Sequence, residues 1–173
     1  MSLGKKLVQS AQKEAALGRP LPLEASASET SNGATIHARA KLADADKYTK
    51  MTGEVVVSIE NAKQGGAPAH GSSAQERVER FAQSATYLPE RLSYVETDVG
   101  GTAIARSTPD TMSGRRGAYF EAQVKDDEVK LQRFQPGQSG PKRESVPFPL
   151  SDDLLSRVVE DAANALRPRR ERK

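Results

Sequence analysis

Residues 21–42, LPLEASASETSNGATIHARAKL, contain the pattern that decides the fold. In residues 34–42, apolar side chains alternate with polar and basic ones, which is the two-residue period of a strand that buries one face. Residues 21–28 alternate in the same way. Between the two segments, Asn32-Gly33 is a strong hairpin signal because both residue types tolerate positive φ. The stretch therefore predicts a β-hairpin with one apolar and one polar face.

Helical and strand patterns follow on both sides of this hairpin. A four-residue apolar spacing predicts the first helix, the capping-box pair Ser73 and Glu76 opens a second, and Ser151 caps a third. The expected helices span 3–17, 73–88 and 151–166. The expected strands span 21–28, 34–42, 54–60, 92–95, 103–106, 118–124, 129–131 and, as an edge strand at most, 146–150. Residues 43–53 are expected to be a polar connection, and 61–72, 107–117 and 135–144 to be loops.

The order of these elements predicts an α+β fold. Consecutive strands are joined as hairpins and no βαβ rhythm is present, which is typical of an antiparallel sheet. We expect the N-terminal, central and C-terminal helices to pack mainly on one side of it. Residues 1–166 are interpreted as a single domain, and residues 167–173 as a basic C-terminal tail.

Composition excludes several kinds of chemistry. The 173 residues contain no cysteine, so disulfides, thiol nucleophiles and iron–sulfur clusters are ruled out. Two histidines are too few for a His-rich metal site, and no metal or cofactor is expected. The sequence shows neither an apolar run long enough to span a membrane nor a signal peptide at its start. The expected location is therefore the cytoplasm.

The basic charge is concentrated at the C-terminus. Lys and Arg number 26 and Asp and Glu 23, a net charge of +3. Residues 167–173 alone carry +4, so the rest of the chain carries −1. The tail either attracts an acidic partner, such as nucleic acid, a phospholipid head group or an acidic protein, or aids solubility. Its basic residues are Arg167, Arg169, Arg170, Arg172 and Lys173.

A search for catalytic motifs finds none. P-loop, dinucleotide-binding, zincin and nucleophile-elbow signatures are all missing from the sequence. His70 lies in a loop without neighbours to orient it, and His37 lies mid-strand on the polar face. The sequence therefore favours a non-enzymatic protein, although a small hydrolase or transferase that uses His37 with a carboxylate is kept as an alternative.

Two groups of basic residues are candidate binding sites. The glycine-flanked pair Arg115 and Arg116, with Lys142 and Arg143 from a second loop, would form an anion site if the two loops meet, and would otherwise be solvated. The polar strand face of His37, Arg39 and Lys41 either binds something acidic or, as we favour, faces water.

No family is recognised in the sequence, so function is inferred from these features alone. The leading hypothesis is a non-enzymatic binding or adaptor protein that contacts another protein through an open sheet face. Self-association through the small-residue strands 21–28 and 34–42 is a further expectation. The main alternative is binding of nucleic acid or another polyanion through the tail and the Arg115 and Arg116 loop.

Overall fold

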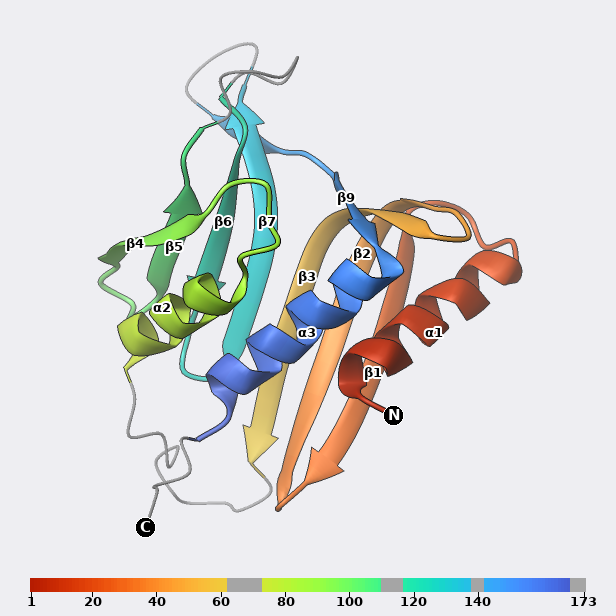
Figure 1. Ribbon diagram of the computed structural model, residues 1–173, viewed down its shortest axis with the longest axis horizontal. Coiled ribbons are helices and arrows are strands. Elements are labelled where there is room, and N and C mark those ends of the chain that lie inside the picture. Colours follow the sequence, from red (N-terminus) through yellow and green to blue (C-terminus); the bar gives the residue numbers. More distant parts are fainter. Residues whose placement is uncertain (62–72, 110–116, 138–141, 169–173) are drawn as a thin grey trace.

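An antiparallel β-sheet forms the body of the protein (Figure 1). The computed structural model describes residues 1–61, 73–109, 117–137 and 142–168, and this part contains nine strands. Seven strands lie in the order β1-β2-β3-β7-β6-β5-β4, while β8 pairs with β7 and β9 with β3. The strands are β1 (Leu23–Ser31), β2 (Ala34–Ala45), β3 (Thr49–Asn61), β4 (Leu92–Thr97), β5 (Ala103–Ser107), β6 (Tyr119–Val124), β7 (Glu128–Pro136), β8 (Arg143–Ser145) and β9 (Phe148–Ser151).

Three helices lie in front of the same face of this sheet in Figure 1. They are α1 (Leu3–Ala16), α2 (Ala74–Ser84) and α3 (Asp152–Leu166). Helix α1 contacts β1 and β2, α2 contacts β4 to β6, and α3 contacts β3, β7 and β9. Each helix begins after a serine whose hydroxyl accepts a backbone N–H of the first turn. Within the described ranges, no helix has the length and apolar character needed to cross a membrane.

The α+β class and the antiparallel sheet predicted from the sequence are confirmed. Asn32 and Gly33 form the expected turn, with φ of 52° and 76°, and Ser31 pairs with Ala34 across it. The polar connection expected at 43–53 is wrong. Strand β2 continues to Ala45, and β3 starts four residues later, because the β2–β3 pairing absorbs register shifts near Leu42.

Strands β3 and β7 pair over only part of their length and then diverge. Val55–Ser58 of β3 pair with Leu131–Glu128 of β7. Beyond this region the same edge of β3 pairs with β9, and the end of β7 pairs with β8. Residues 135–144 were expected to form a loop, and residues 146–150 at most an edge strand. Together they supply β8 and β9, which fill the gap, here called the fork, that opens between β3 and β7. Each diverging strand needs a new hydrogen-bonding partner there.

The hydrophobic core lies between the sheet and the helices. Alternate residues of every long strand point into it, as the sequence pattern predicts. The apolar stripe of α3 closes the core over β3 and β7. The largest completely buried apolar side chains of the core are Leu3, Leu7, Leu42, Phe81, Leu131, Phe148, Leu155 and Leu166.

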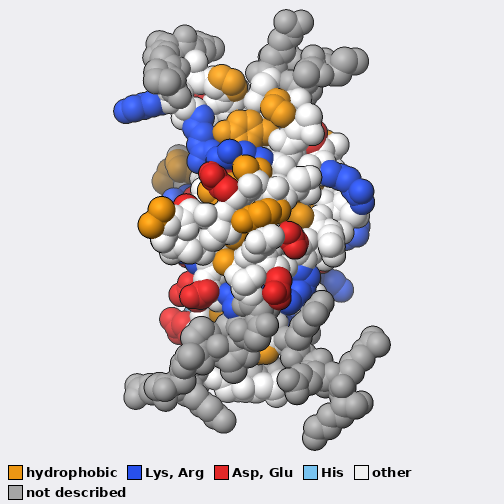
Figure 2. Space-filling view, turned by 90° about the vertical axis from the view of Figure 1, so that its left-hand side faces the viewer, with side chains coloured by type: hydrophobic (Ala, Val, Ile, Leu, Met, Phe, Trp, Pro, Cys, Tyr) orange, Lys and Arg blue, Asp and Glu red, His pale blue; other side chains and the backbone are white. Residues whose placement is uncertain are grey.

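The two outer edges of the seven-strand path are not equivalent. At the β1 edge, the backbone N–H of Ser26 donates to the hydroxyl of Ser10 on α1 at 3.2 Å. At the β4 edge, the β4–β5 pairing shifts register between Tyr94 and Glu96, so Val95 is an extra residue in β4. Figure 2 shows this β4 side, where hydrophobic side chains lie in small groups between charged ones. Strand β2 is bonded on both edges, so self-association through an exposed edge of 34–42 is not available.

Lys50 is a completely buried cation that joins three segments of the chain. Its ammonium donates to Asp152 Oδ1 at 2.7 Å and to the carbonyl oxygen of Asp46 at 2.9 Å. Asp152 also accepts from the side chain of Gln12 on α1 at 2.9 Å. A buried ammonium is tolerated only when it is paired and hydrogen-bonded, so this contact fixes the start of α3 against the β2–β3 turn.

Helices α1 and α3 are closely packed at Gly4. A Cβ atom at this position would overlap the backbone oxygen of Ser156 on α3. The N–H of Gly4 donates to Glu160 Oε1 at 2.7 Å. Glycine is therefore required here by the lack of space between the two helices rather than by its own backbone angles.

Replacing Gly4 with alanine is expected to destabilise the protein by about 1–3 kcal/mol, because the helices must separate to admit one methyl group. Urea unfolding of Gly4→Ala measures this loss. The matched control is Lys5→Ala, which alters an exposed position of the same helix and should change the free energy of unfolding by less than about 0.5 kcal/mol. Equal stability of the two variants would contradict the close packing.

Replacing Lys50 with methionine is expected to lower the free energy of unfolding by about 2–3 kcal/mol, because Asp152 is then left beside an apolar side chain. Denaturant titration at neutral pH measures the change. Lys47→Met, at an exposed lysine of the β2–β3 turn, serves as the control and should leave the free energy of unfolding nearly unchanged. A Lys50→Met variant as stable as the unmodified protein would show that the buried pair contributes nothing.

Candidate functional site

The face of the sheet opposite the helices, here called the open face, is the candidate site. His37, Arg39 and Lys41 of β2 lie on it, since their neighbours Ile36 and Ala38 are buried beneath the helices. The β1–β2 register places Ser28, Ser26 and Glu24 of β1 opposite these three residues. The polar face read from the sequence thus lies on the uncovered side of the sheet.

Lys41 belongs to a row of compensated charges on the open face. Its ammonium lies 3.9 Å from Glu54 Oε1 on β3. The other oxygen of Glu54 accepts from the side chain of Gln132 on β7 at 3.1 Å. The positive charge of Lys41 is therefore already balanced within the sheet, and this row offers little to a charged ligand.

Arg39 belongs to a different row, called the central row, which is formed by Arg39, Val56 and Lys130. The register pairs Arg39 with Val56 and Val56 with Lys130 across three adjacent strands. Val56 is only 4% exposed although it lies on the open face. The stems of long basic side chains cover apolar neighbours in this way. Among the described residues, neither Arg39 nor Lys130 has a carboxylate within 4 Å.

Acidic residues surround the central row at the margins of the open face. They come from the outer strands and from the strand ends, where the pairing places them on this side of the sheet. We call this set the acidic rim. Its members are Glu24, Glu60, Glu96 and Glu128. The open face is thus positive at its centre and negative at its margins.

At the end of the open face near β8, a buried carboxylate binds two arginines. Glu121 of β6 is 1% exposed and accepts from Arg106 Nε at 2.9 Å. Arg143 of β8 donates from both terminal nitrogens to the two oxygens of Glu121, and Gln123 adds a bond of 2.7 Å. We call these four residues the Glu121 cluster. It ties β5, β6 and the short strand β8 together.

Two aromatic rings support the Glu121 cluster. The guanidinium of Arg143 stacks 3.8 Å from the ring centroid of Phe134. Its Nη1 also donates to the hydroxyl of Tyr119 at 3.3 Å. Phe134 is 8% exposed, so its ring is covered by this arrangement. Arg143 is therefore held by a carboxylate, a phenol and a π face together.

The pKa of Glu121 is lowered below its usual value. Burial alone raises the pKa of this carboxyl, but hydrogen bonds from Arg143, Arg106 and Gln123 outweigh that effect. The same bond to Glu121 raises the pKa of Arg143. Glu121 thus stays ionised at neutral pH, and both arginines keep their counter-charge.

His37 lies beside a carboxylate without a proper hydrogen bond. Its Nε2 is 3.5 Å from Glu60 Oε2 and has no hydrogen-bond partner among the described residues. The side chains of His37 and Glu60 are 41% and 77% exposed. The Nε2 atom itself is shielded from water, and without a hydrogen bond to Glu60 the ring lacks the contact that would orient it as a general base.

The other predicted anion-binding residues meet different outcomes. Arg115 and Arg116 lie outside the described residues. Lys142 is exposed, whereas Arg143 binds the internal carboxylate of Glu121 rather than presenting its full guanidinium to an external anion. The described ends of the two loops do meet, since Gly117 lies close enough to Pro136 for an added Cβ to be crowded.

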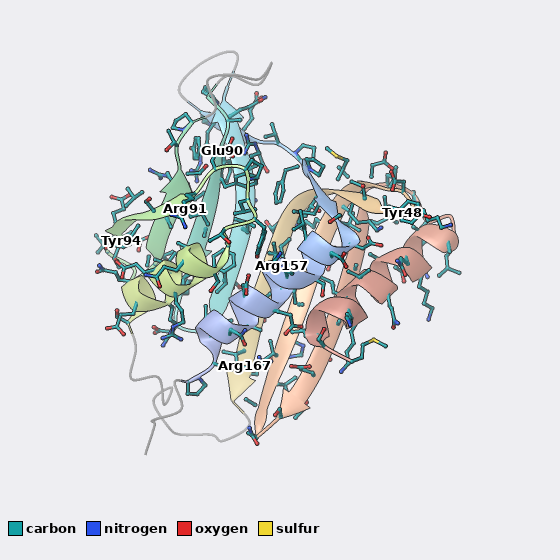
Figure 3. The ribbon with its side chains drawn as sticks, in the orientation of Figure 1. Tyr48, Glu90, Arg91, Tyr94, Arg157 and Arg167 are labelled. Atoms are coloured by element: carbon teal, nitrogen blue, oxygen red, sulfur yellow. The ribbon has the colours of Figure 1, made fainter. Side chains whose placement is uncertain are left out.

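The predicted basic tail begins with a residue that is bound to the domain. Arg167 follows α3, where Figure 3 labels it, and its Nη2 donates to Glu29 Oε1 on β1 at 2.7 Å. Its Nη1 donates to Asn164 at 2.8 Å. The remaining basic residues of the tail, Arg169, Arg170, Arg172 and Lys173, lie outside the described residues.

A hollow of about 620 Å³ lies on the helix side, where α1, the β2–β3 turn and α3 meet. Tyr48 stands at this end of the molecule in Figure 3. The carboxylate of Asp46 accepts the N–H groups of Tyr48 and Thr49, which lower its pKa. Asp152 is bound by Gln12 and Lys50. The acids of this hollow are thus already engaged in structural bonds.

The helix side also contains a tyrosine and an aspartate that are paired with each other. Tyr87 donates to Asp161 Oδ2 at 2.9 Å, while Arg157 of α3 stacks over its ring. Burial, and then the charge of Asp161, raise the pKa of Tyr87, so the phenol stays protonated. Among the described residues, no group of three His, Asp or Glu is arranged to hold a metal ion.

Comparisons with known proteins found no matching family model, curated protein or solved structure.

Sequence reasoning did not identify the Glu121 cluster or the central row. The alternation of residues 118–124 places Glu121 on the polar side of its strand, which was the available signal. Its partners Arg106 and Arg143 are distant in the chain and come together only through strand pairing. Val56 gives no signal because residues 55–57 are all valine.

Replacing Glu121 with glutamine is expected to lower the free energy of unfolding at pH 7 by about 2–4 kcal/mol, since two arginines lose their shared carboxylate. The depressed pKa means that this contribution is present above the unfolded value of about 4.3 and is lost as pH falls below it. The stability difference between the unmodified protein and Glu121→Gln should therefore narrow from pH 5 to pH 3, as measured by urea unfolding.

Glu24→Gln provides the control, because Glu24 is exposed on β1 and makes no ion pair with a described residue. It should change stability by less than about 0.5 kcal/mol at pH 7. A difference for Glu121→Gln that stays constant between pH 5 and pH 3 would contradict the depressed pKa.

Proposed function

We propose that this chain is a non-enzymatic protein-binding module that receives a partner on its open face. In this proposal acidic groups of the partner meet Arg39 and Lys130, and an apolar residue beside them packs on the side-chain stems of these two residues above the buried Val56. The single observation that carries the proposal is the central row, in which two cations without carboxylate partners among the described residues flank a buried valine.

The position of the central row supports this role. Its strands β2, β3 and β7 are interior strands of the sheet, bonded to a neighbour on each side. A site on rigid, hydrogen-bonded strands loses little freedom when a partner binds. The acidic rim opposes partners whose charges are arranged differently, so it adds specificity rather than affinity.

The size of the open face is appropriate for a modest interface. Seven strands spaced about 4.8 Å apart, each contributing about 20 Å of length, present on the order of 600 Å². Standard protein interfaces bury about 800 Å² on each partner, and transient ones bury less. Contact confined to this face thus favours a reversible adaptor rather than a permanent subunit.

The open face suits a protein partner better than nucleic acid. Single strands stack their bases on exposed aromatic rings, but Phe134 is covered by Arg143. The acidic rim would repel a phosphate backbone lying across the sheet. A hydrolase or transferase based on His37 and Glu60 would have to work on a face open to water.

The test uses quantitative affinity capture with the full chain as bait. Arg39→Glu combined with Lys130→Glu should remove a specific set of captured proteins, because it reverses both central cations. The control, Lys5→Glu with Lys13→Glu, makes the same charge change on exposed positions of α1 and should retain that set. A partner confirmed in purified form should bind the open-face variant at least about 100-fold more weakly.

Three results would overturn the proposal. The first is an identical captured set for the unmodified protein and both variants. The second is recovery of nuclease-sensitive material alone, which would favour polyanion binding. The third is a purified partner whose affinity is lowered equally by the α1 control and by the open-face variant, which would indicate unspecific charge effects.

A further inference from the structure

We infer that Arg106 is a carboxylate-binding residue of the open face, and that it holds an acidic side chain or a C-terminal carboxylate of the partner through its two terminal nitrogens. This inference rests on the proposed function and adds the chemical group that the partner must present. It concerns the part of the guanidinium that the Glu121 cluster leaves unused.

The unused part of Arg106 follows from the bonds around Glu121. The two oxygens of this carboxylate receive one bond from Arg106 Nε, two from Arg143 and one from Gln123. Four donors fill the usual acceptor capacity of a carboxylate. Glu121 therefore has no lone pair left for the terminal nitrogens of Arg106. Among the described residues, Nη1 and Nη2 of Arg106 have no acceptor.

Arg106 is also held in place before any ligand arrives. It lies on β5, between β4 and β6, and its Nε is fixed at 2.9 Å from a carboxylate that is itself 1% exposed. Its own side chain is 37% exposed. Because Nε is anchored while the side chain keeps this exposure, a ligand can bind the two terminal nitrogens with little further loss of side-chain entropy.

The charges around Arg106 favour a ligand that carries a single negative charge. The Glu121 cluster contains two guanidinium groups and one carboxylate, which leaves one positive charge uncompensated. Glu96 faces the same side from β4, yet it makes no ion pair with Arg106. A partner carboxylate fits this excess of one, and the charges of Glu121 and Glu96 oppose a doubly charged phosphate more strongly than a singly charged carboxylate.

The experiment is an NMR titration of the ¹⁵N-labelled full chain with sodium acetate at constant ionic strength. The Nε–Hε resonance of Arg106, assigned by its loss in Arg106→Lys, should shift saturably with a dissociation constant on the order of 10 mM. Arg106→Lys keeps the charge but loses the paired donors, and backbone shifts of neighbouring β5 residues should then show at least about tenfold weaker binding. Arg91→Lys, at an exposed arginine ahead of β4, is the matched control and should bind like the unmodified protein (Figure 3).

Each remaining outcome overturns the inference. Shifts that do not saturate, or that persist unchanged in Arg106→Lys, would show that Arg106 binds no carboxylate. Inorganic phosphate binding at least ten times more tightly than acetate would make this a phosphate site instead. The titration needs no partner, so it can fail while the capture experiment with Arg39 and Lys130 succeeds; that result would overturn only the inference about Arg106. If the titration succeeds and the capture experiment fails, only the proposed function is overturned.

Discussion

The pairing of β3 with β7 is the constraint on which the rest of the structure depends. Only residues 55–58 of β3 and 128–131 of β7 are joined, and these few bonds connect the N-terminal hairpins to the C-terminal ones. The strands then separate, and segment 143–151 fills the gap with β8 and β9. The same segment leads into α3, which covers the junction on the helix side. The core and the open face are therefore both built across a narrow seam.

Local patterns explain why the sequence predicts most of the fold. The alternation in 34–42, the Asn32-Gly33 turn and the helix caps are determined by neighbours in the chain, and all are present in the structure. The fork could not be predicted in this way. Whether β9 pairs with β3 depends on where β7 leaves it, which is a property of distant segments and leaves no periodic trace in residues 143–151.

The candidate site illustrates the same limit at the level of side chains. The sequence indicated that Arg39 and Arg143 are basic residues that could bind a ligand, but it did not indicate which residues are their neighbours in the sheet. Strand pairing gives Arg39 a valine and Arg143 a buried carboxylate, so one cation stays uncompensated and the other becomes structural. A formal charge count therefore says little about a surface until the pairing of its strands is known.

The unequal protection of the sheet edges has a consequence for behaviour at high concentration. A helix hydroxyl occupies an N–H of β1 at Ser26, and the extra residue Val95 distorts β4 at the opposite side. At these two positions the borders lack the straight, free row of backbone groups that templates cross-β growth. Both features therefore oppose the pairing of a second molecule's strand along these borders.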